Sequence, residues 1–290
     1  MEYKVTALFI AFNPELEALK NSVQILKDQG CDICLVNNSK EEISPFFQSM
    51  KVINFGQNKG IAQAQFTGME WAFLENESDF VLQMDQDSVP SHDLIENLLE
   101  SWETLASINE KVGLIGSQDI DKDTLVASQA KINKGRQIGK TGLIQVIEIL
   151  SSGSLIPKST FFKVGGPDPK LFIDLVDFDY CWRIRASGLK VIKNPTSKIF
   201  HKLGDGQVKV FGFLSVGLPK PFRHYYSVRN TVYLILNGKA PLFWRVTNIF
   251  KVLFKLLVYP ITLPQGKERL LFILKGLKDG ILKRFDIINA

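Results

Sequence analysis

The stretch VLQMDQDSVP (residues 81–90) joins a run of apolar residues to two carboxylates. The apolar residues between Asp79 and Asp85 predict a buried strand, because the run is short, continuous and bounded by polar residues. Alternation along an extended segment puts Asp85 and Asp87 on one side, about 6–7 Å apart. Carboxylates that face the same way repel each other unless a cation lies near them, and their oxygens suit Mg²⁺ or Mn²⁺. The alternative is a solvated turn in which Asp87 or Ser91 caps the next helix.

Strand and helix patterns alternate on both sides of this stretch. They predict strands at residues 5–12, 33–38, 51–56, 79–85 and 112–117, and helices at 15–29, 61–74 and 93–105. This order indicates βαβ units, and hence an α/β fold with a Rossmann-like, mainly parallel sheet flanked by helices. Ligands of such sheets bind outside the carboxyl ends of the strands. Those ends carry Phe12–Asn13, Asn37–Asn38, Phe55–Asn58 and Asp85–Asp87.

A second group of carboxylates lies in LFIDLVDFDYCWRIRASGLKV (residues 171–191). Asp174, Asp177 and Asp179 stand among large apolar residues, where burial raises proton affinity and suits a general base. The alternative is structural: Asp177 or Asp179 caps the helix and pairs with Arg183. Asp179 and Arg183 have the i,i+4 spacing that such a pair needs, so both interpretations can hold for different acids.

The composition, 45% hydrophobic and 22% charged, fits a folded protein. Three cysteines (Cys31, Cys34 and Cys181) provide no disulfide framework or second metal-binding pair, so we expect core thiols and a reducing compartment. The first residues lack the basic start and cleavage site of a signal peptide, which predicts a cytoplasmic protein. No apolar run is long enough to predict a transmembrane helix.

The order of these motifs resembles glycosyltransferase family 2. The resemblance covers roughly residues 5–235 and rests on AFNP, VNNS, NKGIAQAQ, DQDS, SSGS, FIDLVDFDYCWR and FH, in that order. More closely, the chain is similar to the bacterial rhamnosyltransferase branch, which uses dTDP-L-rhamnose. The resemblance implies a GT-A fold, an inverting mechanism, a divalent metal (Mg²⁺ or Mn²⁺) and a nucleotide-sugar donor. The region lacks the Q-x-x-R-W signature of processive synthases, which favours single or distributive addition.

The resemblance also implies roles for single residues. Asp177 falls where the family has its catalytic base. Asp87, Asp85 and His201 would hold the metal, although a lone histidine is usually structural and the sequence alone does not bring His201 near Asp87. The nucleotide pocket would be lined by Phe12, Asn13, Asn37, Asn58, Lys59, Gly60, Asp85 and Gln86. The family usually has aspartate where Asn37 stands, which leaves the bound nucleotide open.

We expect a GT-A catalytic domain at residues 1–205, with a nucleotide-sugar half at about 1–117 and an acceptor half at about 146–205. A loop or hairpin insertion at 118–145 separates the two halves. Residues 206–290 would form a basic and apolar helical extension.

This extension is the main source of positive charge. From Leu242 onward it has nine Lys and Arg against three Asp and Glu. Such a composition predicts amphipathic helices on an anionic membrane surface, and the alternative is an ordinary helical subdomain. The resemblance supports a polyprenyl-diphosphate-linked glycan acceptor whose phosphates meet Arg229. We therefore expect a peripheral protein on the inner face of the cell membrane.

Other functions stay open from the sequence. The donor could be a UDP-linked galactose, galactofuranose or N-acetylglucosamine, or the chain could be a non-catalytic, membrane-bound subunit of a glycan assembly complex. A sugar-nucleotidyltransferase is disfavoured, because no glycine-rich loop follows the first strand. Nucleic-acid binding is not expected, because the basic residues are confined to an apolar tail. The oligomeric state is not fixed, and a homodimer is one option.

Overall fold

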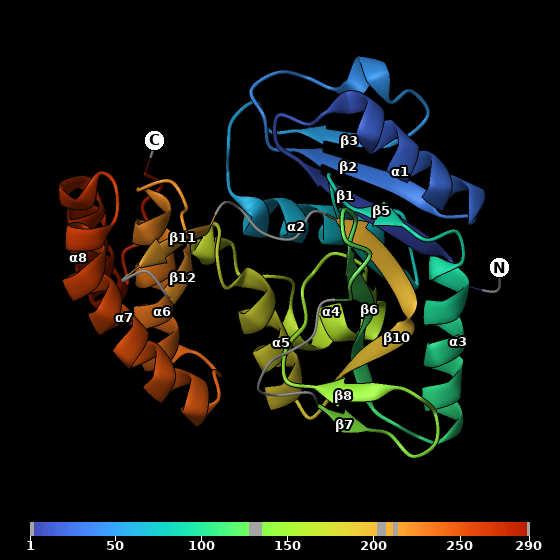
Figure 1. The fold of residues 1–290 in the computed structure, drawn as a ribbon. Coiled ribbons are helices and arrows are strands. Elements are labelled where there is room, and N and C mark those ends of the chain that lie inside the picture. Colours follow the sequence, from blue (N-terminus) through green and yellow to red (C-terminus); the bar gives the residue numbers. More distant parts are fainter. Residues whose placement is uncertain (1–2, 128–134, 202–206, 211–213, 289–290) are drawn as a thin grey trace.

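A ten-stranded sheet forms the centre of the molecule (Figure 1). The computed structural model describes residues 3–127, 135–201, 207–210 and 214–288. The strands of this sheet are β1 (Val5–Ala11), β2 (Asp32–Asn37), β3 (Lys51–Asn54), β4 (Phe80–Asp85), β5 (Val89–Pro90), β6 (Val112–Asp121), β7 (Arg136–Gln137), β8 (Ile144–Val146), β9 (Ser154–Pro157) and β10 (Lys190–His201). Their order is β3-β2-β1-β4-β9-β6-β10-β8-β7, and β5 pairs with β10.

The predicted parallel arrangement is confirmed for the first four of these strands in the order. β1 pairs in parallel with both β2 and β4, and β2 pairs in parallel with β3. β9 then enters antiparallel between β4 and β6, which makes the second half of the sheet mixed. β6 and β10 are again parallel. The carboxyl ends of β1, β2, β4, β6 and β10 therefore meet at one edge.

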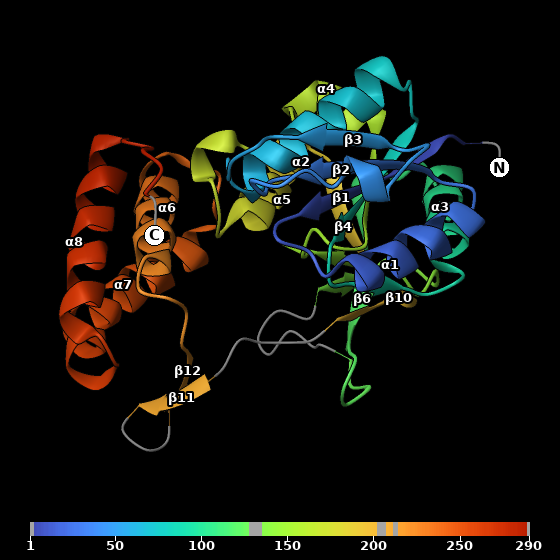
Figure 2. The ribbon, with the colours of Figure 1, turned by 90° about the horizontal axis from the view of Figure 1, so that it is seen from above.

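Helices cover both faces of the sheet (Figures 1 and 2). α1 (Leu16–Asp28) and α3 (Leu94–Ser107) pack on one face. The other face is covered by α2 (Ile61–Glu70), its continuation η2 (Trp71–Glu75), α4 (Lys158–Val164) and α5 (Val176–Ala186). β1 is buried along its whole length because its alternate residues meet these two layers, as in parallel sheets. The three cysteines are buried free thiols, which confirms their expected place in the core.

One strand is longer than the sequence pattern predicts. β6 continues beyond residue 117 to Asp121, into the segment expected to be an insertion loop. Pairing with β10 explains the extension, since Lys198 to His201 lie opposite Gln118 to Asp121. The longer β6 carries Asp119 to the edge of the sheet where the strand ends meet.

The C-terminal region adds a hairpin and three helices. β11 (Gln207–Val210) pairs with β12 (Leu214–Gly217), and α6 (Arg223–Asn237), α7 (Leu242–Thr262) and α8 (Gly266–Leu282) follow. The helices share a small core of their own, made by Val228, Val252, Tyr259, Leu263 and Ile273. The expected boundary between residues 205 and 206 lies outside the described residues. Within the described part of the chain, no helix has the length and apolarity to cross a membrane.

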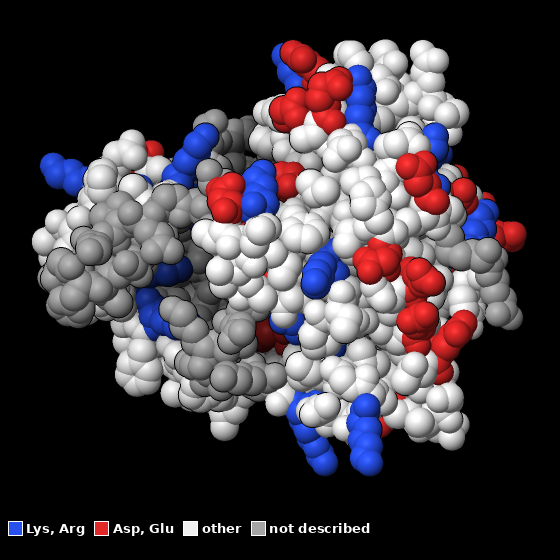
Figure 3. All heavy atoms as spheres, turned by 45° about the vertical axis from the view of Figure 1, so that its right-hand side comes forward, with Lys and Arg blue, Asp and Glu red and all other residues white. Residues whose placement is uncertain are grey.

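Charged side chains are mixed on the face of the molecule seen in Figure 3. Acidic side chains gather in small groups at the top and right of this view, and basic side chains are spread over the face, singly or in pairs. The net charge of +5 therefore does not appear as a basic patch on this face.

Candidate active site

Asp85 and Asp87 lie where the sequence predicts, at the carboxyl end of β4. Asp85 is the last residue of the strand and is partly buried, while Asp87 is exposed. Gln86 between them fixes the segment to the end of β1: its Oε1 accepts from Phe12 N at 2.6 Å, and its Nε2 donates to Phe12 O at 3.1 Å. The ends of two neighbouring parallel strands are thus locked together by one amide side chain.

A network of asparagines holds the next loop. Asn38 Nδ2 donates to Asn58 Oδ1 at 2.9 Å, and Asn38 Oδ1 accepts from Lys59 N at 2.7 Å. Asn58 Oδ1 also accepts from Gly60 N at 2.9 Å. On the β1 side, Asn13 N donates to Ser39 Oγ at 2.6 Å. Phe12, Asn13, Asn58, Lys59 and Gly60, all predicted to line the nucleotide pocket, therefore lie at the carboxyl edge of one half of the sheet.

Asn37 is occupied inside its own turn. Its side chain is buried; Nδ2 donates to Glu41 O at 2.6 Å and to Asn54 Oδ1 at 2.8 Å, and Oδ1 accepts from Ser39 N at 3.1 Å. A nucleotide contact by Asn37 stays a prediction. Asn38, which follows Asn37 directly and is not among the predicted site residues, is the residue that bridges to the 58–60 loop.

The SSGS segment (residues 151–154) connects the two groups of carboxylates. Ser152 Oγ accepts from Asp85 N at 3.2 Å and donates to Ser88 Oγ at 2.9 Å. Gly153 N donates to Gln83 O at 2.8 Å. Gly153 has a φ of 72°, and a Cβ there would overlap Ser117 Oγ, so this tight approach requires glycine. Ser151 at the other end of the segment hydrogen-bonds Asp177.

Asp177 lies in the first turn of α5, and its proton affinity is high. Burial raises the pKa of its carboxyl to about 6, hydrogen bonds from Ser151 oppose the shift, and the charges of Asp174 and Asp119 add to it. Burial also raises the pKa of Asp85 to about 7, with further contributions from the charges of Asp177, Asp87 and Asp119. Because Asp85 interacts with both Asp87 and Asp177, these carboxylates face one common region.

His201 reaches the same region through strand pairing. β5, which directly follows the Asp85–Asp87 segment, lies against β10, with Val89 opposite Phe200. His201 Nδ1 is buried and has no hydrogen-bond partner in the described structure. It lies 3.9 Å from Asp119 Oδ1. Burial raises the pKa of Asp119, and the charges of His201 and Lys193 oppose the shift. Asp119 is not among the predicted site residues, because the sequence pattern of residues 118–145 predicts a loop or hairpin insertion.

The donor atoms gathered here suit a divalent cation. Asp85, Asp87 and Asp119 offer carboxylate oxygens and His201 a ring nitrogen, and oxygen-rich sets of this kind suit Mg²⁺ or Mn²⁺. The unpaired Nδ1 of His201 is consistent with a ligand role. Among the described residues, however, no three such side chains are placed close enough together to hold an ion. The donor chemistry fits a metal, and the ligand set stays a prediction.

The loop that precedes α5 has an unusual backbone. Phe172, Asp174 and Leu175 have positive φ values of 62°, 69° and 64°. Phe172, with a ψ of −67°, is the centre of a γ-turn, because Ile173 N donates to Leu171 O at 2.7 Å. Each such residue costs on the order of 1–3 kcal/mol and persists only where its surroundings hold it. The conformation of this loop therefore depends on contacts from elsewhere in the chain.

Asn230 of α6 supplies the main support. Its Nδ2 lies 2.9 Å from Leu171 O and 2.8 Å from the carbonyl oxygens of Ile173 and Asp174. The side chain is fully buried. One amide group thus donates to carbonyls on both sides of the γ-turn and sets where α5 begins.

Arg229 is a correction. It was expected to meet acceptor phosphates, but it is fully buried, and its Nη2 donates to the carbonyl oxygens of Lys170 and Leu171, each at 2.9 Å. Its guanidinium also lies 5.0 Å from the ring centre of Tyr226 and 5.4 Å from that of Phe285. Arg229 cannot reach a ligand, and instead it holds the loop before α5 together with Asn230.

Phe172 connects this loop to the nucleotide side of the site. Its carbonyl oxygen accepts from Ala62 N at 3.2 Å, at the start of α2. Its ring stacks on Tyr226, with 4.6 Å between ring centres. Gly60 has a φ of 86°, and a Cβ there would collide with Phe172. The predicted role of Gly60 beside the nucleotide stays a prediction, but its need for a hydrogen side chain is explained by Phe172.

The two interpretations of the acids near Asp177 can now be separated. Asp179 pairs with Arg183 at 2.7 Å, and Arg183 also donates to Val164 O and Gly166 O, each at 2.9 Å. Asp179 therefore joins α5 to the end of α4, as the i,i+4 spacing predicts. Among the described residues, Asp177 forms no ion pair of this kind with Arg183, and it faces the other carboxylates.

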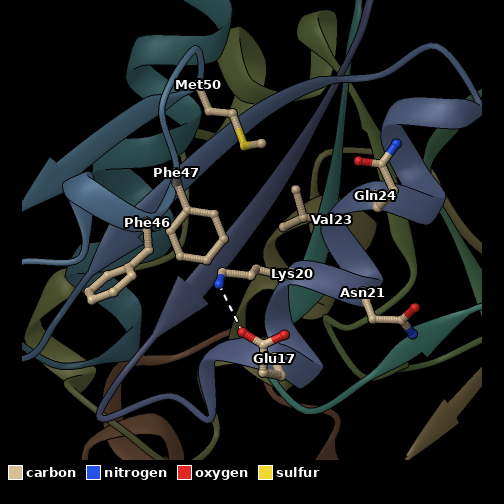
Figure 4. A pocket seen from close by; sticks show the side chains of 8 residues that line it. All are labelled: Glu17, Lys20, Asn21, Val23, Gln24, Phe46, Phe47 and Met50. Atoms are coloured by element: carbon tan, nitrogen blue, oxygen red, sulfur yellow. Dashed lines mark hydrogen bonds and ion pairs between the residues drawn. The ribbon is translucent and has the colours of Figure 1, made fainter.

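A groove away from these carboxylates lies between α1 and residues 46–50 (Figure 4). Its volume is about 370 Å³, and Lys20 and Glu17 form an ion pair at 2.8 Å in it. Phe46, Phe47 and Met50 form the opposite wall. None of the carboxylates considered above lines it, so its size does not make it the active site.

Comparisons with known proteins find relatives in sequence and in fold. The profile of the family "Glycosyl transferase family 2" matches residues 7–144. The chain is 29% identical to the dTDP-rhamnosyl transferase RfbF of Shigella flexneri over 301 aligned positions, which cover 97% of this chain and 96% of RfbF.

Solved structures show the same fold at low sequence identity. GalNAc-T7 with UDP, GalNAc and Mn²⁺ has a TM-score of 0.59 at 13% identity, and the match covers 97% of this chain but only 56% of that one. TarS of S. aureus (residues 1–349, with UDP-GlcNAc) has a TM-score of 0.57 at 12% identity, covering 97% of this chain and 82% of that one. The GT-A fold expected from the sequence is confirmed. By these matches and this fold, the chain is similar to glycosyltransferases of family 2 over residues 7–144 and to a bacterial dTDP-rhamnosyl transferase along nearly its whole length.

Proposed function

We propose that this glycosyltransferase moves L-rhamnose from dTDP-L-rhamnose to a hydroxyl of a lipid-linked cell-surface glycan, with inversion at the anomeric carbon. The similarity to RfbF along nearly the whole chain supports the donor. The observation that carries the chemistry is the raised pKa of Asp177, about 6, beside the Asp85–Asp87 segment. A carboxylate of this kind is a base at neutral pH and still accepts a proton readily.

In this mechanism Asp177 removes the proton from the acceptor hydroxyl as the hydroxyl attacks the anomeric carbon. Attack comes from the face opposite the nucleoside diphosphate, so one displacement inverts the configuration. Asp85, Asp87 and His201 are the proposed ligands of Mg²⁺ or Mn²⁺. A cation bound there would neutralise charge on the diphosphate.

The nucleotide is proposed to lie over the ends of β1, β2 and β4. The residues that would line it are Phe12, Asn13, Asn37, Asn58, Lys59, Gly60, Asp85 and Gln86. Support comes from the hydrogen bonds that already fix these loops to one another, because a site that is formed before binding loses less entropy when the ligand arrives. Phe12 is 46% exposed, a suitable surface for a base to stack on.

A panel of nucleotide sugars tests the donor. Thermal unfolding of the full chain is measured with dTDP-rhamnose, UDP-galactose, UDP-galactofuranose and UDP-N-acetylglucosamine, each with Mg²⁺, Mn²⁺ or EDTA. We expect the largest rise in Tm with dTDP-rhamnose, and only when a divalent cation is present. A larger rise with a UDP sugar would replace the donor, and no rise with any of them would favour a non-catalytic subunit.

The C-terminal helices support the proposed membrane location. α7 carries a stripe of exposed apolar side chains, all within about a third of the helix circumference at 100° per residue. Its members are Leu242, Phe243, Val246, Ile249, Phe250, Leu253, Leu257 and Ile261. Lys267, Lys275 and Lys278 are exposed on α8, next in the chain. An apolar stripe beside lysines suits the inner face of a membrane with anionic lipids.

Flotation with vesicles tests this location. Deleting α7 and α8 would be ambiguous, because α8 packs on α6, and α6 holds the loop before Asp177. We therefore choose Phe250→Glu in the stripe and the matched control Phe162→Glu on α4, whose phenylalanine is 62% exposed. Wild type and control should float with phosphatidylglycerol vesicles, and Phe250→Glu should remain in solution. Concentration-dependent sedimentation that Phe250→Glu abolishes, without flotation, would instead show a homodimer covering the stripe.

A further inference from the structure

Gln65 of α2 is a polar side chain at a core position. It is 2% exposed, and Met69, one turn later on the same face of the helix, belongs to the buried core. A Cβ on Gly68 would overlap the side chain of Leu8 in β1, so the helix lies close to the sheet at this point. A buried amide costs free energy unless it is hydrogen-bonded, whereas an apolar side chain of similar size would pack here without that cost. The amide of Gln65 is therefore expected to have a role besides packing.

The partner of this amide is Ser151, in the SSGS segment that connects the two groups of carboxylates. Gln65 Nε2 donates to Ser151 Oγ at 3.2 Å, and both side chains are buried. Gln65 Oε1, by contrast, is buried and has no hydrogen-bond partner among the described residues. One end of the amide is thus left unsatisfied while the other donates to Ser151, which indicates that the donor is the end with a function.

The direction of this bond determines what Ser151 can do next. Because Ser151 Oγ accepts from the amide, its hydroxyl hydrogen is left for another acceptor, and an ionised carboxylate can only accept. Asp177 is that acceptor, since both the hydroxyl and the backbone N–H of Ser151 hydrogen-bond its carboxyl. A chain of donors therefore runs from Gln65 through Ser151 to Asp177, and the two bonds from Ser151 restrict how the carboxylate can turn.

The same helix also supports the loop before α5. Ala62 N, one turn before Gln65, donates to Phe172 O at 3.2 Å. At its other neighbour, α2 follows the 58–60 loop directly. A shift of the whole helix would therefore disturb the nucleotide side and the base side together. A substitution that tests Gln65 alone must leave the helix in place, so that only the base side responds.

We propose that Gln65 is a positioning residue that acts on Asp177 through Ser151. The amide orients the Ser151 hydroxyl, and the hydroxyl holds the Asp177 carboxylate in the orientation from which it removes a proton. This inference rests on the transferase reaction proposed above, in which Asp177 is the base. Without the amide, the hydroxyl can turn away from Asp177, and the carboxylate then keeps only the backbone bond from Ser151.

Carbon-13 NMR of the full chain, labelled at the carboxyl carbons of aspartate, tests this link at pH 8 in EDTA without any substrate. The signal of Asp177 is the one that Asp177→Asn removes. Gln65→Met removes the amide at similar side-chain length, and Ser151→Ala removes the hydroxyl. The matched control is Gln63→Met, which changes an amide that donates to Thr67 Oγ1 within the same helix.

We expect Gln65→Met and Ser151→Ala to move the Asp177 signal in the same direction, and Gln63→Met to leave it in place. The double variant should move the signal no further than Ser151→Ala alone, because both changes remove the same hydrogen bond to Asp177. The signals of the other aspartates should stay at their wild-type positions, which shows that the variants keep the fold.

Turnover of dTDP-rhamnose, measured as dTDP released with water as the acceptor, tests the consequence for catalysis. We expect kcat to fall at least about tenfold in Gln65→Met and Ser151→Ala, because a catalytic group misplaced by about 1 Å can lose about 100-fold in rate. Donor KM should keep its wild-type value, and Gln63→Met should change neither constant. In the Asp177→Asn background the same two substitutions should cause no further loss, since no carboxylate is left to position.

Two results would overturn the proposal. One is an Asp177 signal that stays at the wild-type position in Gln65→Met. The other is a loss of turnover as large in the Asp177→Asn background as in wild type, which would mean that Gln65 acts by another route. Near-normal turnover by Asp177→Asn alone would contradict the proposed function instead, and this failure is distinct because the Asp177 signal would still respond to Gln65→Met.

Discussion

The nucleotide side and the base side of this active site are held in place in different ways. On the nucleotide side, Gln86, Asn38 and Asn58 connect the ends of parallel strands that already lie next to each other. On the base side, a loop with three positive φ values is held by Asn230, which is 56 to 59 residues away in the sequence. The difference shows that α6 is a structural partner of the loop before Asp177, the proposed catalytic base, in addition to the membrane contact proposed for the C-terminal helices.

The largest effect is expected at the base itself. Asp177→Asn should reduce transfer by about 10²–10⁴-fold, because a general base typically contributes that much. The Tm shift caused by dTDP-rhamnose should stay unchanged, since the nucleotide side does not depend on Asp177. Asp179→Asn is the contrast: it breaks the ion pair with Arg183 and should lower Tm while keeping most of the turnover. Near-normal turnover by Asp177→Asn would remove Asp177 as the base.

Asn230→Ala should have the next largest effect. It removes a donor from the carbonyls of Leu171, Ile173 and Asp174, of which Leu171 O keeps its bond from Arg229, at a cost of about 1–3 kcal/mol for each buried group that stays unsatisfied. Misplacement of the base by about 1 Å can lower the rate about 100-fold. We expect kcat to fall by about that factor while donor KM changes little.

The matched control for this variant is Asn237→Ala, near the exposed end of α6, where the amide donates only to its own helix at Tyr233 O. If the donor KM of Asn230→Ala rose by the same factor as kcat fell, α6 would support the nucleotide side and the base side of the site alike.

A smaller effect is expected for Asn38→Ala on the nucleotide side. It removes the bonds to Asn58 Oδ1 and Lys59 N, each worth about 1 kcal/mol, so donor KM should rise by up to about thirtyfold. kcat should stay within about twofold, and Asn21→Ala on the surface of α1 serves as control. Loss of kcat without a change in KM would place Asn38 with the base rather than with the nucleotide.

The smallest effect concerns pH and stability. Since the pKa of Asp177 is raised to about 6, kcat should fall as pH drops through about 6, where the base becomes protonated. The sign for folding is the opposite one: a raised carboxyl pKa contributes stability at low pH that is lost as pH rises through about 6. Asp177→Asn should therefore melt a few degrees above wild type at pH 8 in EDTA, and the gap should close near pH 4. A gap that stays constant with pH would contradict the raised pKa.

Much of the nucleotide side could be predicted from the sequence. Continuous apolar runs predict buried strands, and the Asp85–Asp87 pair follows one of these runs directly. The structure confirms these strands and the pairing of Asp179 with Arg183. Local pattern was sufficient because each of these features depends on residues close to one another in the chain.

The base side was harder to predict because its contacts are long-range. Asp119 belongs to a strand only because β10 pairs with it about eighty residues later in the chain, beyond the reach of local periodicity. Nothing in the sequence marks Asp174 and Leu175 as residues with positive φ, a conformation that usually signals glycine. Arg229 was expected to meet the phosphates of the acceptor, but its partners include the carbonyls of Lys170 and Leu171.

The stack of Tyr226 on Phe172, with Phe172 pressed against Gly60, has a practical consequence for protein engineering. The C-terminal regions of related enzymes could be exchanged to change their acceptor. On the sequence alone, the junction of such a hybrid would be placed near residue 205. Such a hybrid would replace Tyr226, so that a residue from the other enzyme packs on Phe172. A shift of the Phe172 ring would then change its contact with Gly60. To keep the contact between Phe172 and Tyr226, residues 169–176 must be exchanged together with the C-terminal helices.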